Sequence, residues 1–65
     1  MDARKLEYGG LYIVRGSIDV RKIKIQEVTK TTYMVRNMDK VADDFRIEIS
    51  RFAKEYCVLE KVEQI

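Results

Sequence analysis

The side chains that carry most enzymatic chemistry are scarce in this chain of 65 residues. Histidine is absent, so the commonest general base and neutral-pH switch is missing, and no Ser-His-Asp or Cys-His constellation can form. The single cysteine, Cys57, has no second thiol for an internal disulfide. Beside Val58, we expect it to be a small buried hydrophobic residue. These features predict a protein that is not an enzyme and that uses no cofactor.

One cluster of acidic residues stands out in the sequence: Asp43 and Asp44 are adjacent, and Asp39 and Glu48 are nearby. A divalent cation requires several oxygen ligands that converge on one point. Adjacent residues at the start of a strand point to opposite faces, and this segment lacks the glycine of calcium-binding loops. We therefore predict a solvated loop here and no metal site.

Basic side chains are more numerous, although their excess is small. Thirteen Lys and Arg against eleven Asp and Glu give a net charge of +2, far below the excess that marks a dedicated nucleic-acid binder. Residues 1–32 carry seven basic and four acidic side chains, whereas residues 33–65 carry six and seven. Whether the basic side chains of the first half meet on one surface depends on how the strands pair in the folded protein.

Short apolar runs between turn signals predict one small all-β domain, preceded by a polar leader of residues 1–8. Residues 11–14, between Gly9-Gly10 and Gly16-Ser17, have the aromatic and β-branched content of a strand buried on both faces. Residues 45–50 alternate strictly between apolar and polar, as a half-buried strand does. A single helical turn capped by Ser50 is expected before the last strand. The five predicted strands are residues 11–14, 18–28, 32–35, 45–50 and 57–62.

The run of residues 18–28 changes the phase of its alternation twice. Ile18 and Val20 are at even positions, Ile23 and Ile25 at odd ones, and Val28 is even again. A flat strand with this pattern would turn its core face to water, so we expect a β-bulge near residues 21–22 and an irregularity near residues 26–27. Bulges bend strands, and bent strands suit a small closed sheet.

The C-terminal third also fits a helix. Seven apolar residues from Met38 to Leu59 are spaced alternately four and three apart, which would form an apolar seam along residues 38–62. Ile47, Val58 and Val62 do not lie on this seam. The alternative fold is therefore a three-stranded antiparallel sheet packed on a long C-terminal helix.

A hairpin loop at residues 29–31 sets the register of the two strands that flank it. Ile25 then faces Val35 on the inner side of the sheet, and Lys24 lies opposite Arg36 on the outer side.

Two registers remain open for the next hairpin. If Val35 pairs with Ile47 and Tyr33 with Ile49, Arg36 lies opposite Arg46. The inner face is then Ile23, Ile25, Tyr33, Val35, Phe45, Ile47 and Ile49, and the outer face has the row Lys24, Arg36 and Arg46, flanked by Lys22 and Met34. Like charges directly across strands repel, so such a row requires an anionic partner. A slip of two residues keeps the core and pairs Arg36 with Asp44 in an ordinary surface ion pair.

The aromatic residues divide into two groups. A core this small requires Tyr33, Phe45, Phe52 and Tyr56. Tyr8 and Tyr12 flank the double glycine near basic residues, where a ring can stack on a base or anchor a partner protein. The predicted binding residues are therefore Tyr12, Lys22, Lys24, Arg36 and Arg46.

The order of five short strands, with one helical turn before the last, resembles SH3-like small β-barrels. Three stretches, residues 24–33, 45–52 and 56–60, look like the short SH3-like proteins of bacteriophage and prophage genomes. The resemblance covers residues 11–62 and is one of rhythm, so it transfers no site residue. Polyproline binding is not implied, because the aromatic residues that define peptide-binding SH3 domains have no counterpart here.

We predict a non-enzymatic protein-interaction module, such as a phage-type accessory protein that binds a host or phage protein. The alternative is a nucleic-acid-binding small barrel that uses Lys22, Lys24, Arg36 and Arg46 on phosphates. A homo-oligomer that buries an uncovered strand edge is a third reading. The start of the chain lacks the apolar stretch of a signal peptide, and no apolar run reaches the length that a bilayer demands. We therefore expect a cytoplasmic protein that does not act at a membrane.

Overall fold

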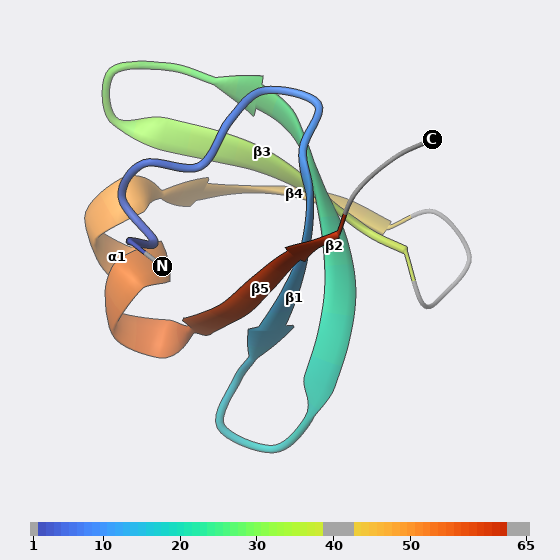
Figure 1. Ribbon diagram of the computed structural model, residues 1–65. Helices are drawn as coiled ribbons and strands as arrows, with labels where there is room; N and C mark the ends of the chain where they lie inside the picture. The colour runs from blue at the N-terminus through green and yellow to red at the C-terminus, as the bar shows by residue number, and fades with distance from the viewer. Residues whose placement is uncertain (1, 39–42, 63–65) are drawn as a thin grey trace.

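The computed structural model describes residues 2–38 and 43–62 of the chain, and Figure 1 shows their arrangement. The elements, in chain order, are β1 (Leu11–Arg15), β2 (Val20–Val28), β3 (Thr32–Asn37), β4 (Asp43–Glu48), α1 (Ile49–Glu55) and β5 (Cys57–Val62). Within these described ranges, no helix has the length and apolar character needed to cross a membrane.

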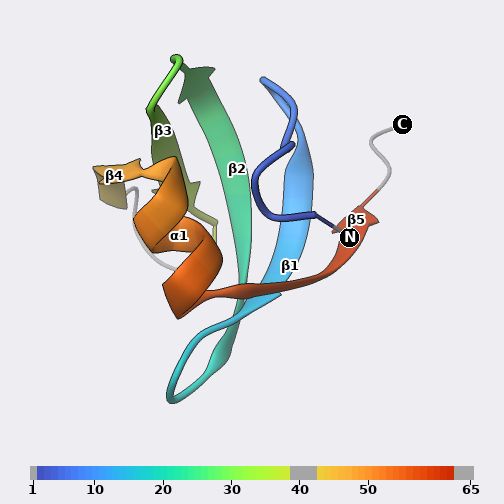
Figure 2. The ribbon, with the colours of Figure 1, turned by 90° about the vertical axis from the view of Figure 1, so that its left-hand side faces the viewer.

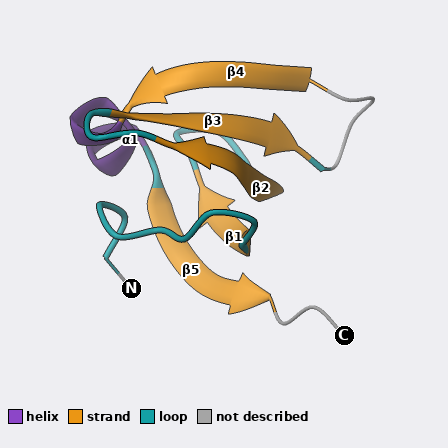
Figure 3. Ribbon diagram, turned by 90° about the horizontal axis from the view of Figure 1, so that it is seen from above, coloured by secondary structure: helices purple, strands orange, loops and turns teal. Residues whose placement is uncertain are grey.

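All five strands form one antiparallel sheet in the order β4-β3-β2-β1-β5. Figures 2 and 3 show that the sheet is curled and that α1 connects its two outermost strands, β4 and β5. The predicted all-β fold with a short helix before the last strand is confirmed. The alternative long C-terminal helix is wrong, because β4 is extended and α1 is only seven residues long.

The core covers the inner face of the curled sheet. Its buried members are Leu6, Tyr12, Val14, Ile23, Ile25, Tyr33, Val35, Phe52 and Val58. Phe45, Ile47 and Ile49 pack against them from β4 and the start of α1. The predicted inner face is therefore correct for the residues that lie in strands, since alternate side chains of a strand share a face regardless of its exact partner, whereas Ile49 reaches the core from α1.

Strand β2 contains one of the two expected irregularities. Its register against β3 shifts between Ile25 and Glu27, which confirms the irregularity near residues 26–27. The bulge expected near residues 21–22 is wrong, because β2 pairs continuously with β1 from Lys24 to Val20. Ile18 and Val20 are 91% and 54% exposed. They do not belong to the inner face, so the alternation of inward-facing residues does not change phase between Val20 and Ile23.

The helix α1 begins one residue before the predicted cap. Glu48 occupies the N-cap without a side-chain hydrogen bond, so the prediction that Ser50 caps the helix is wrong. Strand β4 accordingly ends at Glu48 and not at Ser50. The Ile49 N–H donates to the carbonyl of Thr31 at 2.8 Å, which ties the start of α1 to the β2–β3 hairpin. Phe52, the buried residue of α1, joins the helix to the core.

The leader packs against the core instead of lying free. Leu6 is 5% exposed, and its N–H donates to the hydroxyl of Tyr33 at 3.2 Å. The same hydroxyl donates to the carbonyl of Ala3 at 2.9 Å. The N–H of Glu7 donates to the hydroxyl of Tyr12 at 2.9 Å. Two buried tyrosines therefore hold the leader over the core.

The double glycine allows the leader to turn into β1. Gly9 has φ of +78°, a region that side chains other than glycine rarely adopt. A Cβ on Gly10 would lie 2.7 Å from Cε2 of the Tyr12 ring, closer than atoms can approach. Both positions thus require glycine for reasons of backbone conformation and space.

Candidate functional site

The register between β2 and β3 brings two predicted site residues together on the outer face of the sheet. Lys24 lies opposite Arg36, and Ile25 lies opposite Val35, as predicted. Ile25 and Val35 are both 0% exposed and fill the core. Lys24 and Arg36 therefore point outward, because neighbouring residues of a strand face opposite sides.

Strand β4 pairs with β3 two residues away from the first predicted register. Val35 lies opposite Phe45 and Tyr33 opposite Ile47, so the predicted pairs with Ile47 and Ile49 are wrong. Ile49 begins α1 and is not part of the strand. A shift of two residues leaves every side chain on its face, which is why the core is unaffected.

The same shift places Arg36 opposite Asp44 and not opposite Arg46. Nε and Nη2 of Arg36 donate to the two carboxylate oxygens of Asp44 at 2.8 and 3.2 Å. The hydrogen bond from Arg36, more than its charge, lowers the pKa of Asp44, and Asp44 in turn raises the pKa of Arg36. The prediction of a row of cations formed by Lys24, Arg36 and Arg46 is therefore wrong, and the alternative ion pair of Arg36 with Asp44 is confirmed.

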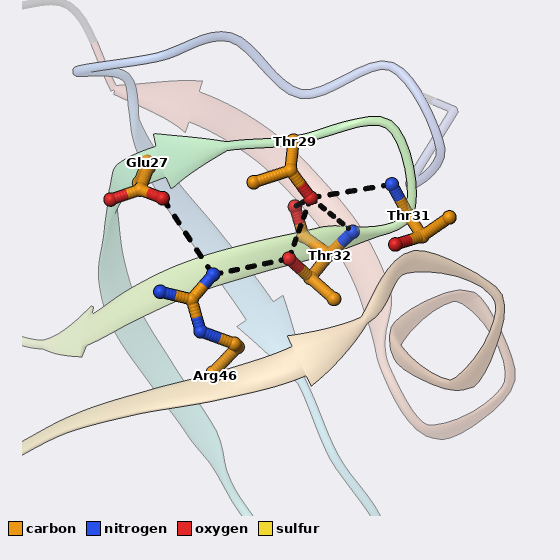
Figure 4. A network of polar contacts seen from close by, with 5 residues as sticks. All are labelled: Glu27, Thr29, Thr31, Thr32 and Arg46. Atoms are coloured by element: carbon orange, nitrogen blue, oxygen red, sulfur yellow. Dashed lines mark hydrogen bonds and ion pairs between the residues drawn. The ribbon is translucent and has the colours of Figure 1, made fainter.

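Arg46 is held by a polar network at the β2–β3 hairpin (Figure 4). Its Nη1 lies 3.6 Å from Oε1 of Glu27 and donates to Oγ1 of Thr32 at 3.3 Å. Oγ1 of Thr29 accepts the N–H groups of Thr31 and Thr32 at 3.3 and 2.9 Å, closing the hairpin. Arg46 thus contacts the β2–β3 hairpin and has the carboxylate of Glu27 beside it.

Replacing Asp44 with asparagine is expected to lower stability modestly at pH 7, because the pair is exposed and screened by water. The folded pKa of Asp44 is lowered, so its contribution is present above the unfolded pKa of about 4 and is lost as pH falls through the folded value. Urea unfolding of the wild type and Asp44→Asn should therefore differ at pH 7 and converge at low pH. An equal difference at pH 2 and pH 7 would contradict this role of the carboxylate.

The basic residues of β2 have apolar neighbours on β1. Lys24 lies opposite Leu11, and Lys22 lies opposite Ile13. The ammonium group of Lys24 has no ion-pair partner within residues 2–38 and 43–62. The four basic residues predicted to bind a partner all lie on the outer face. Arg36 and Arg46 each have a carboxylate partner.

An apolar surface adjoins these lysines where β1 pairs with the edge strand β5. Leu11 lies opposite Val62, and both are half-buried, as is Ile13. The β1–β5 register shifts between Ile13 and Val14, which makes Leu59 the extra residue of a bulge. Leu59 is 46% exposed and points away from the core. We call Leu11, Ile13, Leu59 and Val62 the outer patch.

Sequence reasoning missed the outer patch. The run of residues 11–14 predicts a strand buried on both faces, whereas Leu11 and Ile13 are only half-buried on the outer side. Cys57, predicted to be buried, is exposed, because Val58 is the residue of β5 that enters the core. A continuous apolar run does not reveal which of its residues face inward.

The two tyrosines beside the double glycine have different roles. Tyr12 is 2% exposed, so the prediction that it contacts a partner is wrong. Tyr8 is 76% exposed. It lines a surface depression of about 380 Å³ together with Leu11 and Val62 of the outer patch. Tyr8 therefore extends the outer patch with the kind of side chain that anchors protein partners.

The acidic residues near β4 are described only in part. Asp39 lies outside the described residues, as does the side chain of Asp43. Asp44 is engaged by Arg36. The described residues contain no group of three or more His, Cys, Asp or Glu side chains that could hold a metal ion.

Fold and surface together define a small all-β protein with one curled sheet and an apolar patch along one edge of that sheet. Comparisons with protein-family models, with curated proteins and with solved structures find no match.

Proposed function

We propose that this chain is a non-enzymatic protein-interaction module that binds its partner through the outer patch. The observation that carries the proposal is the partly exposed apolar surface formed by β1 and β5, in which Leu11, Ile13 and Val62 are half-buried and Leu59, at a bulge, is exposed. Exposed apolar side chains that are contiguous and rimmed by polar residues are typical of protein-binding sites.

Two features support this function over nucleic-acid binding. Arg36 and Arg46, half of the basic residues that the alternative requires, are engaged by Asp44 and Glu27. Phosphate binding depends on cations that replace condensed counterions, and cations already paired contribute less to it. The outer patch also offers apolar contact, which phosphates do not need.

The accessory-protein part of the proposal rests on the resemblance of the sequence to the short SH3-like proteins of phage and prophage genomes. The proposed partner is accordingly a host or phage protein.

Leu59→Asp is expected to reduce capture of the partner at least tenfold, because it places a charge at the most exposed side chain of the outer patch. Immobilised wild type and variant would be incubated with nuclease-treated bacterial lysate, and captured proteins compared by quantitative mass spectrometry. Ile18→Asp, at an apolar side chain that is 91% exposed in the β1–β2 turn, is the matched control and should capture the partner normally.

Circular dichroism of each variant checks that the sheet is intact, and Leu59→Ser provides a milder change at the same site. Equal capture by the wild type and both Leu59 variants would refute binding through the outer patch. The same incubation with untreated lysate is a second arm, and capture that occurs there but not in nuclease-treated lysate would favour the nucleic-acid alternative.

A further inference from the structure

Two cations flank the outer patch at opposite ends. Lys24 of β2 lies directly opposite Leu11 of β1, at one end of the patch. Arg15 follows Ile13 by two residues on β1 and lies opposite Cys57 of β5. Neither side chain has an ion-pair partner among the residues that the structure describes.

The spacing of these cations follows from strand geometry. Leu11 and Arg15 are four residues apart on β1, which corresponds to about 13 Å along an extended strand. Apolar side chains of β1 and β5 fill the interval. The surface thus has a basic group at each end of an apolar centre.

We propose that the outer patch binds an extended segment of a partner protein in which apolar residues lie between two acidic residues about four positions apart. This inference rests on the proposed function and names the chemistry of its partner. Carboxylates at that spacing would meet Lys24 and Arg15, while the apolar residues between them would cover Leu11, Ile13 and Leu59.

Electrostatic complementarity of this kind determines which partner binds more than how tightly it binds. Midway along the interval, Ile13 has Glu60 opposite it on β5 and Lys22 opposite it on β2, so a carboxylate placed there would meet charges of both signs and gain little. The acidic residues of the segment are therefore expected at its two ends and not in its middle.

The test uses a phage-displayed library of random peptides of about twelve residues, selected on the wild-type protein. Selected peptides are synthesised and their affinity is measured by fluorescence polarisation at physiological salt. They should carry paired acidic residues around apolar ones, and they should slow the reaction of exposed Cys57 with a bulky thiol reagent severalfold.

Charge reversal then separates the specific contact from overall charge. Arg15→Glu combined with Lys24→Glu should weaken peptide binding at least tenfold. Lys5→Glu combined with Lys30→Glu changes the net charge equally at two exposed lysines away from the outer patch, and should leave binding unchanged.

The outcomes distinguish this inference from the proposed function. Peptides whose binding depends on Leu59 but shows no acidic preference would overturn the inference and leave the function intact. If no selected peptide depends on Leu59, both fail. Tighter, salt-sensitive binding of a single-stranded oligonucleotide at Arg15 and Lys24 would overturn the inference in favour of nucleic acid.

Discussion

Phe52→Ala is expected to remove a large share of the free energy of unfolding of the protein. Phe52 is 1% exposed and meets the ring of Tyr33 edge-on, with a centroid separation of 5.4 Å. Its ring also packs against Tyr56 at 4.9 Å. Removing a buried phenyl ring costs about 3–5 kcal/mol. A chain of this length has a total stability of about 3–10 kcal/mol, at the usual value per residue.

The measurement is urea unfolding followed by circular dichroism, since the chain has no tryptophan. Phe52→Leu is the matched control, because it keeps most of the apolar volume and is expected to cost less than about 2 kcal/mol. An alanine variant with the wild-type midpoint would show that α1 is not anchored through this ring.

Tyr33→Phe is expected to release the leader while the sheet remains folded. The Tyr33 hydroxyl accepts the Leu6 N–H and donates to the Ala3 carbonyl. Phenylalanine keeps the ring, which is 0% exposed, but leaves both groups without their partner. A buried polar group that loses its hydrogen bond costs about 1–3 kcal/mol. Burial also raises the pKa of Tyr33, so the hydroxyl stays protonated and able to donate at neutral pH.

Amide hydrogen exchange of Leu6 reports this release directly, and exchange in Tyr33→Phe should be about five to a hundred times faster than in the wild type. Tyr56→Phe is the matched control, since the Tyr56 hydroxyl makes no hydrogen bond to any described residue. Unchanged Leu6 exchange in Tyr33→Phe would mean that Leu6 packing, and not the hydroxyl, holds the leader.

The number of strands and the inward-facing residues of β2, β3 and β4 follow from the sequence, because alternation reports the face on which each side chain lies. Residues 45–47 illustrate this point: Phe45 and Ile47 pack on the core and Arg46 is exposed. The turn at residues 29–31 and the irregularity near residues 26–27 are also visible in the sequence, as a short polar loop and as a change of phase.

The partners of the charged residues depend on tertiary structure. A register slip of two residues keeps all side chains on their faces, so the pattern does not distinguish Asp44 from Arg46 as the neighbour of Arg36. Because α1 begins at Ile49, Ile49 is not in the strand to pair with Tyr33, and the observed register places Asp44 opposite Arg36. Two of the predicted binding cations are consequently engaged within the protein.

The formation of the outer patch and the burial of the two tyrosines likewise depend on the tertiary structure. Tyr8 and Tyr12 have the same side chain on either side of two glycines, and only the path of the leader places one in the core and the other in water. Leu59 is the extra residue of the β5 bulge and has no partner residue on β1, and its side chain is exposed. Local alternation determined which side chains face inward, whereas long-range strand pairing determined which outward side chains became neighbours.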